Sequence, residues 1–172
     1  MKIQSLFAIS ALSLASTSVF ASAITESDII EAQKKWGTGI VEIGEAKTSG
    51  GDYSQVAKDL IDDLYAYDHG PVAFKPTLAA DDQFRGDFDE ALSYFVGGSI
   101  EEDKGFAIKP WTNVRFENEE VIINGSQAIA MGNYYFTTVE GEEVKVEYSF
   151  GYTHVDDELL INLHHSSLPY AK

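Results

Sequence analysis

Polar side chains able to donate, accept or transfer protons gather near the C-terminus of the chain. An apolar stretch interrupted by Asn162 leads directly into His164, His165, Ser166 and Ser167. Successive side chains of a β-strand point to opposite faces, so Asn162, His164 and Ser166 share one face. The other two residues of the run share the opposite face, and only one histidine can face any one pocket. A structural role for both histidines, hydrogen-bonded near a solvated edge, explains the spacing equally well.

The histidine and cysteine content limits the metal sites that the chain can build. Four histidines and no cysteine are present, which excludes cysteine nucleophiles, iron-sulfur clusters and thiolate zinc sites. With a two-residue turn at Asp156-Asp157, the last hairpin pairs His164 near Ser149. His154 then lies about 16 Å from His164 along the ladder, too far for both to bind one zinc ion at about 2 Å. A site with His69, one C-terminal histidine and a carboxylate stays open, although no spacing favours it.

The first 23 residues are typical of a secretory signal peptide. Lys2 supplies a positive start, residues 3–20 are apolar and uncharged, and Ala21-Ser22-Ala23 fits the small-x-small cleavage rule. A membrane anchor is the weaker alternative, because serines interrupt the apolar run and no stop-transfer flank follows. We therefore expect cleavage near Ala23 and a periplasmic or secreted protein without a membrane-spanning segment.

Removal of the signal peptide leaves one domain over residues 24–172, about 149 residues, which is enough chain to bury a core. The whole chain has a formal net charge of −16. That field repels nucleic acid and anionic membranes, so neither is an expected partner. Acidic groups such as Asp81-Asp82 and Glu101-Glu102-Asp103 are expected on the solvated surface.

Hydrophobic periodicity divides the mature chain into a helical first half and a strand-rich second half, which predicts an α+β fold. The expected helices cover residues 25–49, 52–67 and 87–95. A short extended piece is expected at residues 72–77, and four strands at residues 111–123, 127–139, 144–155 and 159–167. N-terminal helices followed by a long antiparallel meander is the order of the cone-shaped fold of nuclear transport factor two and ketosteroid isomerase. Such a curved antiparallel sheet wraps a helix and leaves a pocket at its mouth.

Six motifs spread over the mature chain add a family resemblance. They are Phe74-Lys75-Pro76-Thr77, Ala91-Leu92-Ser93-Tyr94-Phe95, Lys109-Pro110-Trp111-Thr112, Ala130-Met131-Gly132-Asn133-Tyr134-Tyr135-Phe136, Val144-Lys145-Val146-Glu147-Tyr148 and His164-His165-Ser166-Ser167-Leu168-Pro169-Tyr170. With these motifs the chain resembles the iota-class carbonic anhydrases, a family related to the association domain of calcium/calmodulin-dependent kinase. Fold alone would say little about function, since the cone fold hosts many activities.

The resemblance implies reversible hydration of carbon dioxide to bicarbonate without a metal cofactor, zinc being the alternative. Similar family members place a threonine, a tyrosine and a serine around the substrate, and the matching positions are Thr77, Tyr94 and Ser166. His164 shares the strand face of the serine and completes the expected catalytic set. Either its imidazole or a chain of hydroxyls could take the proton from water.

The expected substrate-binding residues are Phe74, Phe95, His165 and Ser167, the two phenylalanines forming an apolar wall for carbon dioxide. A non-enzymatic ligand-binding or oligomerisation module is the rival interpretation. A proton-transfer enzyme like ketosteroid isomerase is a second rival, which would need a buried acid such as Asp87 or Asp89 beside Tyr94.

A homodimer is expected because three helices leave one face of the long sheet without cover. Either the face with Tyr148, Phe150 and Tyr152 or the opposite face would meet the partner.

Overall fold

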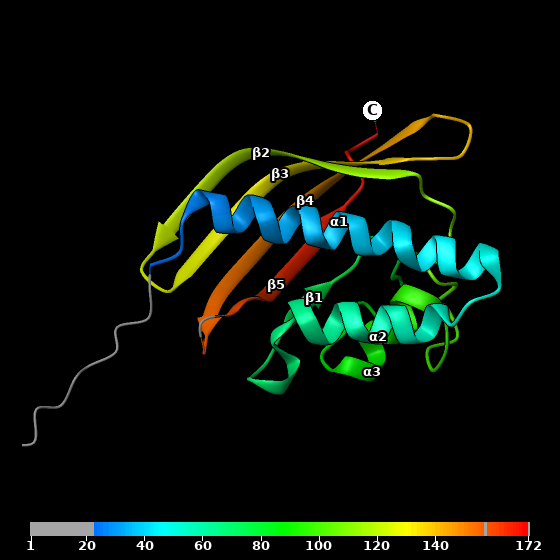
Figure 1. Ribbon diagram of the computed structural model, residues 1–172, viewed down its shortest axis with the longest axis horizontal. Helices are drawn as coiled ribbons and strands as arrows, with labels where there is room; N and C mark the ends of the chain where they lie inside the picture. Colours follow the sequence, from blue (N-terminus) through cyan, green and yellow to red (C-terminus); the bar gives the residue numbers. More distant parts are fainter. Residues whose placement is uncertain (1–22, 157, 172) are drawn as a thin grey trace, which may run out of the picture.

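A computed structural model describes residues 23–156 and 158–171. The predicted signal peptide, apart from Ala23, lies outside the described residues. The elements in chain order are α1 Glu26–Ser49, α2 Tyr53–Leu64, the 3-10 turn η1 Ala66–Asp68, β1 Ala73–Lys75, α3 Phe88–Val96, β2 Asn113–Asn124, β3 Gln127–Thr137, β4 Glu143–Val155 and β5 Glu158–Ser167 (Figure 1). Among the described helices, none has the length and apolar character that a membrane crossing requires.

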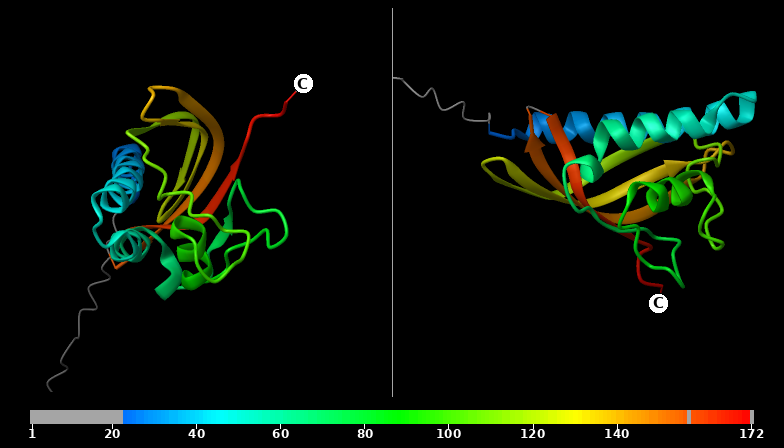
Figure 2. Two further views of the ribbon diagram at one scale, coloured as in Figure 1. Left: turned by 90° about the vertical axis from the view of Figure 1, so that its right-hand side faces the viewer. Right: turned by 90° about the horizontal axis from the view of Figure 1, so that it is seen from below.

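Helix α1 is fixed at both ends by local signals in its sequence. Thr25 and Asp28 form a capping box at its start, and Gly50 ends it with a left-handed backbone at φ 76°. Its inner face carries Trp36 and Ile40, both fully buried. The sheet curves around this helix, so that helices and sheet enclose the interior between them (Figure 2).

The sheet has five strands in the order β1-β5-β4-β3-β2. Strands β2 to β5 form the expected antiparallel meander. Strand β1 adds a parallel pair to this meander, because it pairs with β5 and makes the five-stranded sheet mixed. The short extended piece predicted at residues 72–77 thus covers what would be an open edge of the meander. This pairing sets Phe74 opposite His164.

A β-bulge in the last hairpin shifts the register that the sequence predicts. His154 pairs with Leu159 as expected, but His164 pairs with Phe150 rather than with Ser149. The shift lies where Gly151 pairs with Leu163 and Tyr152 pairs with Ile161, so Asn162 is the extra residue of the bulge. A Cβ on Gly151 would lie 2.8 Å from the Asn162 Oδ1 atom. A larger residue at that position would therefore collide with the bulge.

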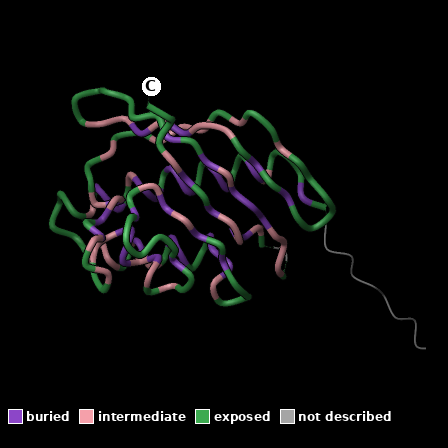
Figure 3. The backbone as a smooth tube through the Cα atoms, turned by 180° about the vertical axis from the view of Figure 1, so that it is seen from behind, coloured by how far each residue is buried: buried purple, intermediate pink, exposed green. Residues whose placement is uncertain are grey.

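The core is an aromatic cluster between α1 and the inner face of the sheet. The Trp36 ring lies within 6.3 Å, centroid to centroid, of six other rings. Tyr148, Phe150 and Tyr152 are buried in this cluster, whereas Ile129 and Met131 on the opposite face of the sheet are about half exposed. Burial alternates along the strands accordingly (Figure 3). The sheet face that no helix covers is therefore the one exposed to solvent, and it is called the outer face below.

Candidate active site

Hydroxyl groups from distant parts of the chain line one small cavity of about 230 Å³ inside the curve of the sheet. Its walls are mainly apolar and aromatic. Its polar lining residues are Thr77, Tyr94, Lys109, Tyr134, His164 and Ser166. The cavity thus contains all four residues of the predicted catalytic set.

The parallel pairing of β1 with β5 brings Thr77 to Ser166. Because Phe74 lies opposite His164, the chain that leaves β1 passes the end of β5, where Ser166 is buried. The Thr77 Oγ1 group donates a hydrogen bond of 2.9 Å to the Ser166 Oγ atom. Residues separated by 89 positions in sequence thereby form one hydroxyl pair.

Helix α3 presents Tyr94 to the same cavity. Asp87 caps the start of this helix, where its carboxylate accepts a hydrogen bond from the Glu90 N–H group. The Tyr94 hydroxyl oxygen accepts a hydrogen bond from the Leu78 N–H group at 3.4 Å, and burial raises the pKa of Tyr94 to about 12. The hydroxyl therefore keeps its proton at neutral pH and can donate it in a hydrogen bond.

Tyr134 is a site residue that our sequence reasoning does not single out. It lies on β3, its side chain is buried, and its hydroxyl forms a hydrogen bond with Ser166. Burial raises the pKa of Tyr134 well above its usual range, and the Ser166 bond acts in the opposite direction. Ser166 thus lies between two hydroxyl partners, Thr77 and Tyr134. Strand alternation with Phe136 is the signal that could have placed Tyr134 on the inner face.

His164 is a buried neutral imidazole. Its Nδ1 atom lies 2.8 Å from the Tyr65 hydroxyl, and the Phe74 ring stacks on it at 4.5 Å between centroids. Burial lowers the pKa of His164 to about 3. A base with this pKa is poorly matched to taking a proton from water near pH 7. Of the two proton acceptors left open by the sequence, the structure therefore favours the hydroxyl chain.

The four predicted substrate-binding residues do not line this cavity. Phe74 and Phe95 are fully buried behind it, where they pack against Tyr94. His165 is exposed on the outer face of β5, and the Ser167 hydroxyl donates a hydrogen bond to Glu147 there at 3.1 Å. The prediction that His165 and Ser167 bind substrate is therefore wrong. Both residues occupy odd-numbered positions after the bulge, and these positions point away from the interior. Aromatic walls come instead from Phe106, Trp111 and Phe136.

Metal binding has no support in the described part of the chain. Among residues 23–156 and 158–171, no group of three or more His, Asp or Glu side chains could hold a metal ion.

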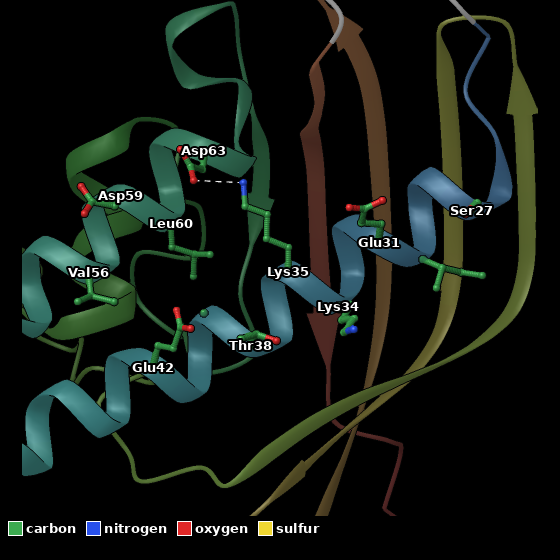
Figure 4. A pocket seen from close by; sticks show the side chains of 12 residues that line it. Ser27, Glu31, Lys34, Lys35, Thr38, Glu42, Val56, Asp59, Leu60 and Asp63 are labelled. Carbon is green, nitrogen blue, oxygen red and sulfur yellow. Dashed lines mark ion pairs between the residues drawn. The ribbon is translucent and has the colours of Figure 1, made fainter.

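A larger hollow of about 780 Å³ lies outside the core, between α1 and α2 (Figure 4). Its charged rim includes Lys35 and Asp63, which form an exposed ion pair of 3.1 Å. Both side chains are more than half exposed, so the groove has the character of a solvated surface. It therefore does not compete with the hydroxyl-lined cavity as a site for chemistry.

The architecture defines the fold class of the protein, a nuclear-transport-factor-two-like fold with a hydroxyl-lined pocket inside the curve of the sheet. A calcium/calmodulin-dependent kinase association domain from Xanthomonas campestris has this fold, with a TM-score of 0.57 and 19% identity over 89% of this chain and 98% of that one. A nuclear-transport-factor-two-like protein from Pseudomonas putida gives 0.56, at 13% identity over 85% of this chain and 87% of that one. These similarities confirm the predicted fold class.

The chain belongs to the metal-independent carbonic anhydrases, whose family model matches residues 27–168. A metal-independent carbonic anhydrase from Nostoc sp. (strain PCC 7120) is 41% identical over 170 residues, which is 95% of this chain and 83% of the relative. A solved cyanobacterial iota-carbonic anhydrase complexed with bicarbonate is 38% identical, with a TM-score of 0.86 over 92% of this chain and all of that one. The family confirms the predicted enzyme class, carbonic anhydrase, and the prediction that no metal cofactor is needed.

Proposed function

We propose that the hydroxyl-lined cavity is where this carbonic anhydrase hydrates carbon dioxide and holds the bicarbonate product. The observation that carries this proposal is the convergence of Thr77, Tyr94 and Ser166 on one small, mainly apolar cavity. The similar cyanobacterial enzyme was solved with bicarbonate bound, which supports the same ligand here.

Each part of the cavity has a use in this reaction. Carbon dioxide is apolar, and aromatic walls can hold it near the hydroxyl cluster. The water oxygen forms a bond to the carbon, one C=O π bond opens, and the negative charge collects on the carboxylate oxygens. Donors fixed beforehand, such as the Tyr94 O–H group, stabilise that charge without reorganisation. The proton of the attacking water leaves through the hydroxyl chain of Thr77, Ser166 and Tyr134 to solvent.

Removal of metal ions is expected to leave the activity unchanged. Stopped-flow measurement of carbon dioxide hydration by the purified mature protein, before and after treatment with a strong chelator, tests this expectation. Loss of activity on chelation with recovery on addition of zinc would contradict the metal-free mechanism but keep the reaction. No hydration above background in any metal state would contradict the proposed enzymatic activity and favour a ligand-binding or oligomerisation module.

A homodimer that packs through the outer face of the sheet is part of the proposal. Ile122, Ile129 and Met131 are each more than half exposed, and strand pairing sets Ile122 directly opposite Ile129. Apolar side chains clustered on an uncovered sheet face favour a self-complementary interface. Light scattering at micromolar concentration should give a dimer, and Ile129→Glu should shift it to monomer. A monomeric wild-type protein would contradict this part of the proposal.

We also propose that the protein is exported and loses residues 1–23 by cleavage. The positive charge and the apolar pattern of that segment support this proposal. Mass spectrometry of protein from the periplasm or medium should find an N-terminus near Ile24. A retained Met1 in a membrane fraction would contradict export with cleavage.

A further inference from the structure

His164 is held by a chain of hydrogen bonds that starts on α1. The Trp36 Nε1–H group donates to the Tyr65 oxygen at 2.9 Å, and that hydroxyl lies 2.8 Å from His164 Nδ1. All three side chains are buried. An indole N–H can only donate, so the Tyr65 oxygen is an acceptor toward Trp36. The hydroxyl satisfies its own proton by donating it to His164 Nδ1.

This direction of donation decides where the imidazole carries its proton. A ring nitrogen that accepts a hydrogen bond has no proton, so the neutral His164 ring is protonated at Nε2. Rotation of the ring is opposed by Phe74, stacked at 4.5 Å, and by Phe150 at 4.3 Å. The chain and the packing therefore fix both the tautomer and the orientation.

The Nε2–H group is then left without an acceptor in the described part of the chain, although it is buried. Buried donors are almost always paired, so an unpaired one calls for an explanation. His164 lines the cavity, whereas Tyr65, which engages its other nitrogen, does not. Because the His164 side chain lines the cavity, a group held inside it is the acceptor available to this N–H.

We propose that Tyr65 is a positioning residue that holds His164 in the Nε2–H tautomer, so that this N–H donates a hydrogen bond to a bicarbonate oxygen. The inference rests on the proposed site and assigns His164 the role of a neutral donor rather than a base. Together with the Tyr94 hydroxyl it gives the cavity two hydrogen-bond donors. The two unprotonated oxygens of bicarbonate are acceptors and match those donors.

Nuclear magnetic resonance of the mature protein with ¹⁵N-labelled histidine tests the tautomer directly. Long-range spectra at pH 7 should show His164 as a neutral ring protonated at Nε2, and added bicarbonate should shift that resonance in a saturable way. A ring protonated at Nδ1, a charged ring, or a resonance that bicarbonate leaves unchanged would overturn the proposal. Carbon dioxide hydration measured on the same sample separates this failure from failure of the proposed site.

Variants test the role of Tyr65 through His164. Tyr65→Phe should populate both tautomers and weaken bicarbonate binding by about tenfold, the scale of one lost hydrogen bond. The matched control is Tyr67→Phe, because the Tyr67 hydroxyl donates to the Arg85 carbonyl oxygen and takes no part in the chain. Bicarbonate binding should be unchanged in that variant.

In the His164→Phe background, Tyr65→Phe should weaken binding no further, since the two residues act as a unit. Additive losses, or an unchanged tautomer in Tyr65→Phe, would overturn the positioning role. If Tyr65→Phe does not fold, the tautomer and its bicarbonate shift in the wild-type protein still decide the proposal.

Discussion

Replacement of Ser166 with alanine is expected to reduce carbon dioxide hydration by about ten- to a thousandfold, the scale of losing one preorganised donor. The Ser166 side chain is buried, accepts a hydrogen bond from Thr77 and bonds to Tyr134. Alanine at this position interrupts the hydroxyl chain on both sides and removes little volume. The fold should therefore be kept while kcat falls, which stopped-flow kinetics together with circular dichroism would show.

The neighbouring residue supplies a matched control of the same type. Ser167 lies on the outer face of β5, where its hydroxyl donates to Glu147. Ser167→Ala should leave hydration unchanged. Equal losses in the two variants would show that the strand end acts only through its structure. Thr77→Val and Tyr94→Phe should resemble Ser166→Ala, since both remove a hydroxyl from the same cavity.

Strand alternation in the amino-acid sequence puts Ser166 and Ser167 on opposite faces of the strand, and the family resemblance points to Ser166 as the one that meets the pocket. Period-two arguments hold within an uninterrupted stretch, and the bulge at Asn162 precedes the whole run that begins at His164. The same bulge makes the predicted pairing of His164 with Ser149 wrong by one residue. A bulge therefore leaves predictions from alternation within one uninterrupted stretch correct. It makes predictions of pairing between strands wrong.

Long-range features of the site could not be predicted from local pattern. The parallel contact between β1 and β5 depends on residues about 90 positions apart, and it alone brings Thr77 to Ser166. Similarly, the low pKa of His164 results from burial among rings contributed by α1, β1 and β4. From the sequence alone a histidine can be given only the usual pKa of its residue type. Its environment in the folded protein decides whether it can act as a base.

Asp103, an acidic residue expected on the surface, is instead buried next to a charged partner. The Asp103 carboxylate is buried and accepts a hydrogen bond of 2.6 Å from the fully buried Arg85 guanidinium. The same guanidinium donates to the carbonyl oxygens of Asp82 and Phe84. Glu102 adds to the anchor, because its carboxylate accepts hydrogen bonds from backbone N–H groups of residues 80–82. The clustering of acidic residues in the sequence suggested that they are solvated. Only the fold reveals the arginine that these carboxylates surround.

This ion pair fastens the segment that follows Thr77 to the loop after α3, and its loss is expected to be costly. Arg85→Met would leave the Asp103 charge buried without its partner, which should lower the free energy of unfolding by about 3–5 kcal/mol. Asp103→Leu should cost about as much for the same reason. Urea unfolding of the mature protein measures both effects, and activity should fall with them because Thr77 loses its anchored neighbours.

The double variant distinguishes a coupled pair from two independent contributions. Arg85 Nε and Asp103 Oδ2 remain buried without hydrogen-bond partners in the described residues, so the pair is not fully satisfied. Arg85→Met combined with Asp103→Leu removes both charges, and its unfolding free energy should be higher than that of either single variant. Arg115→Met serves as the control, since Arg115 pairs with Glu117 and Glu143 on the exposed surface and should contribute little. Additive losses in the double variant would show that the two charges stabilise the loop separately.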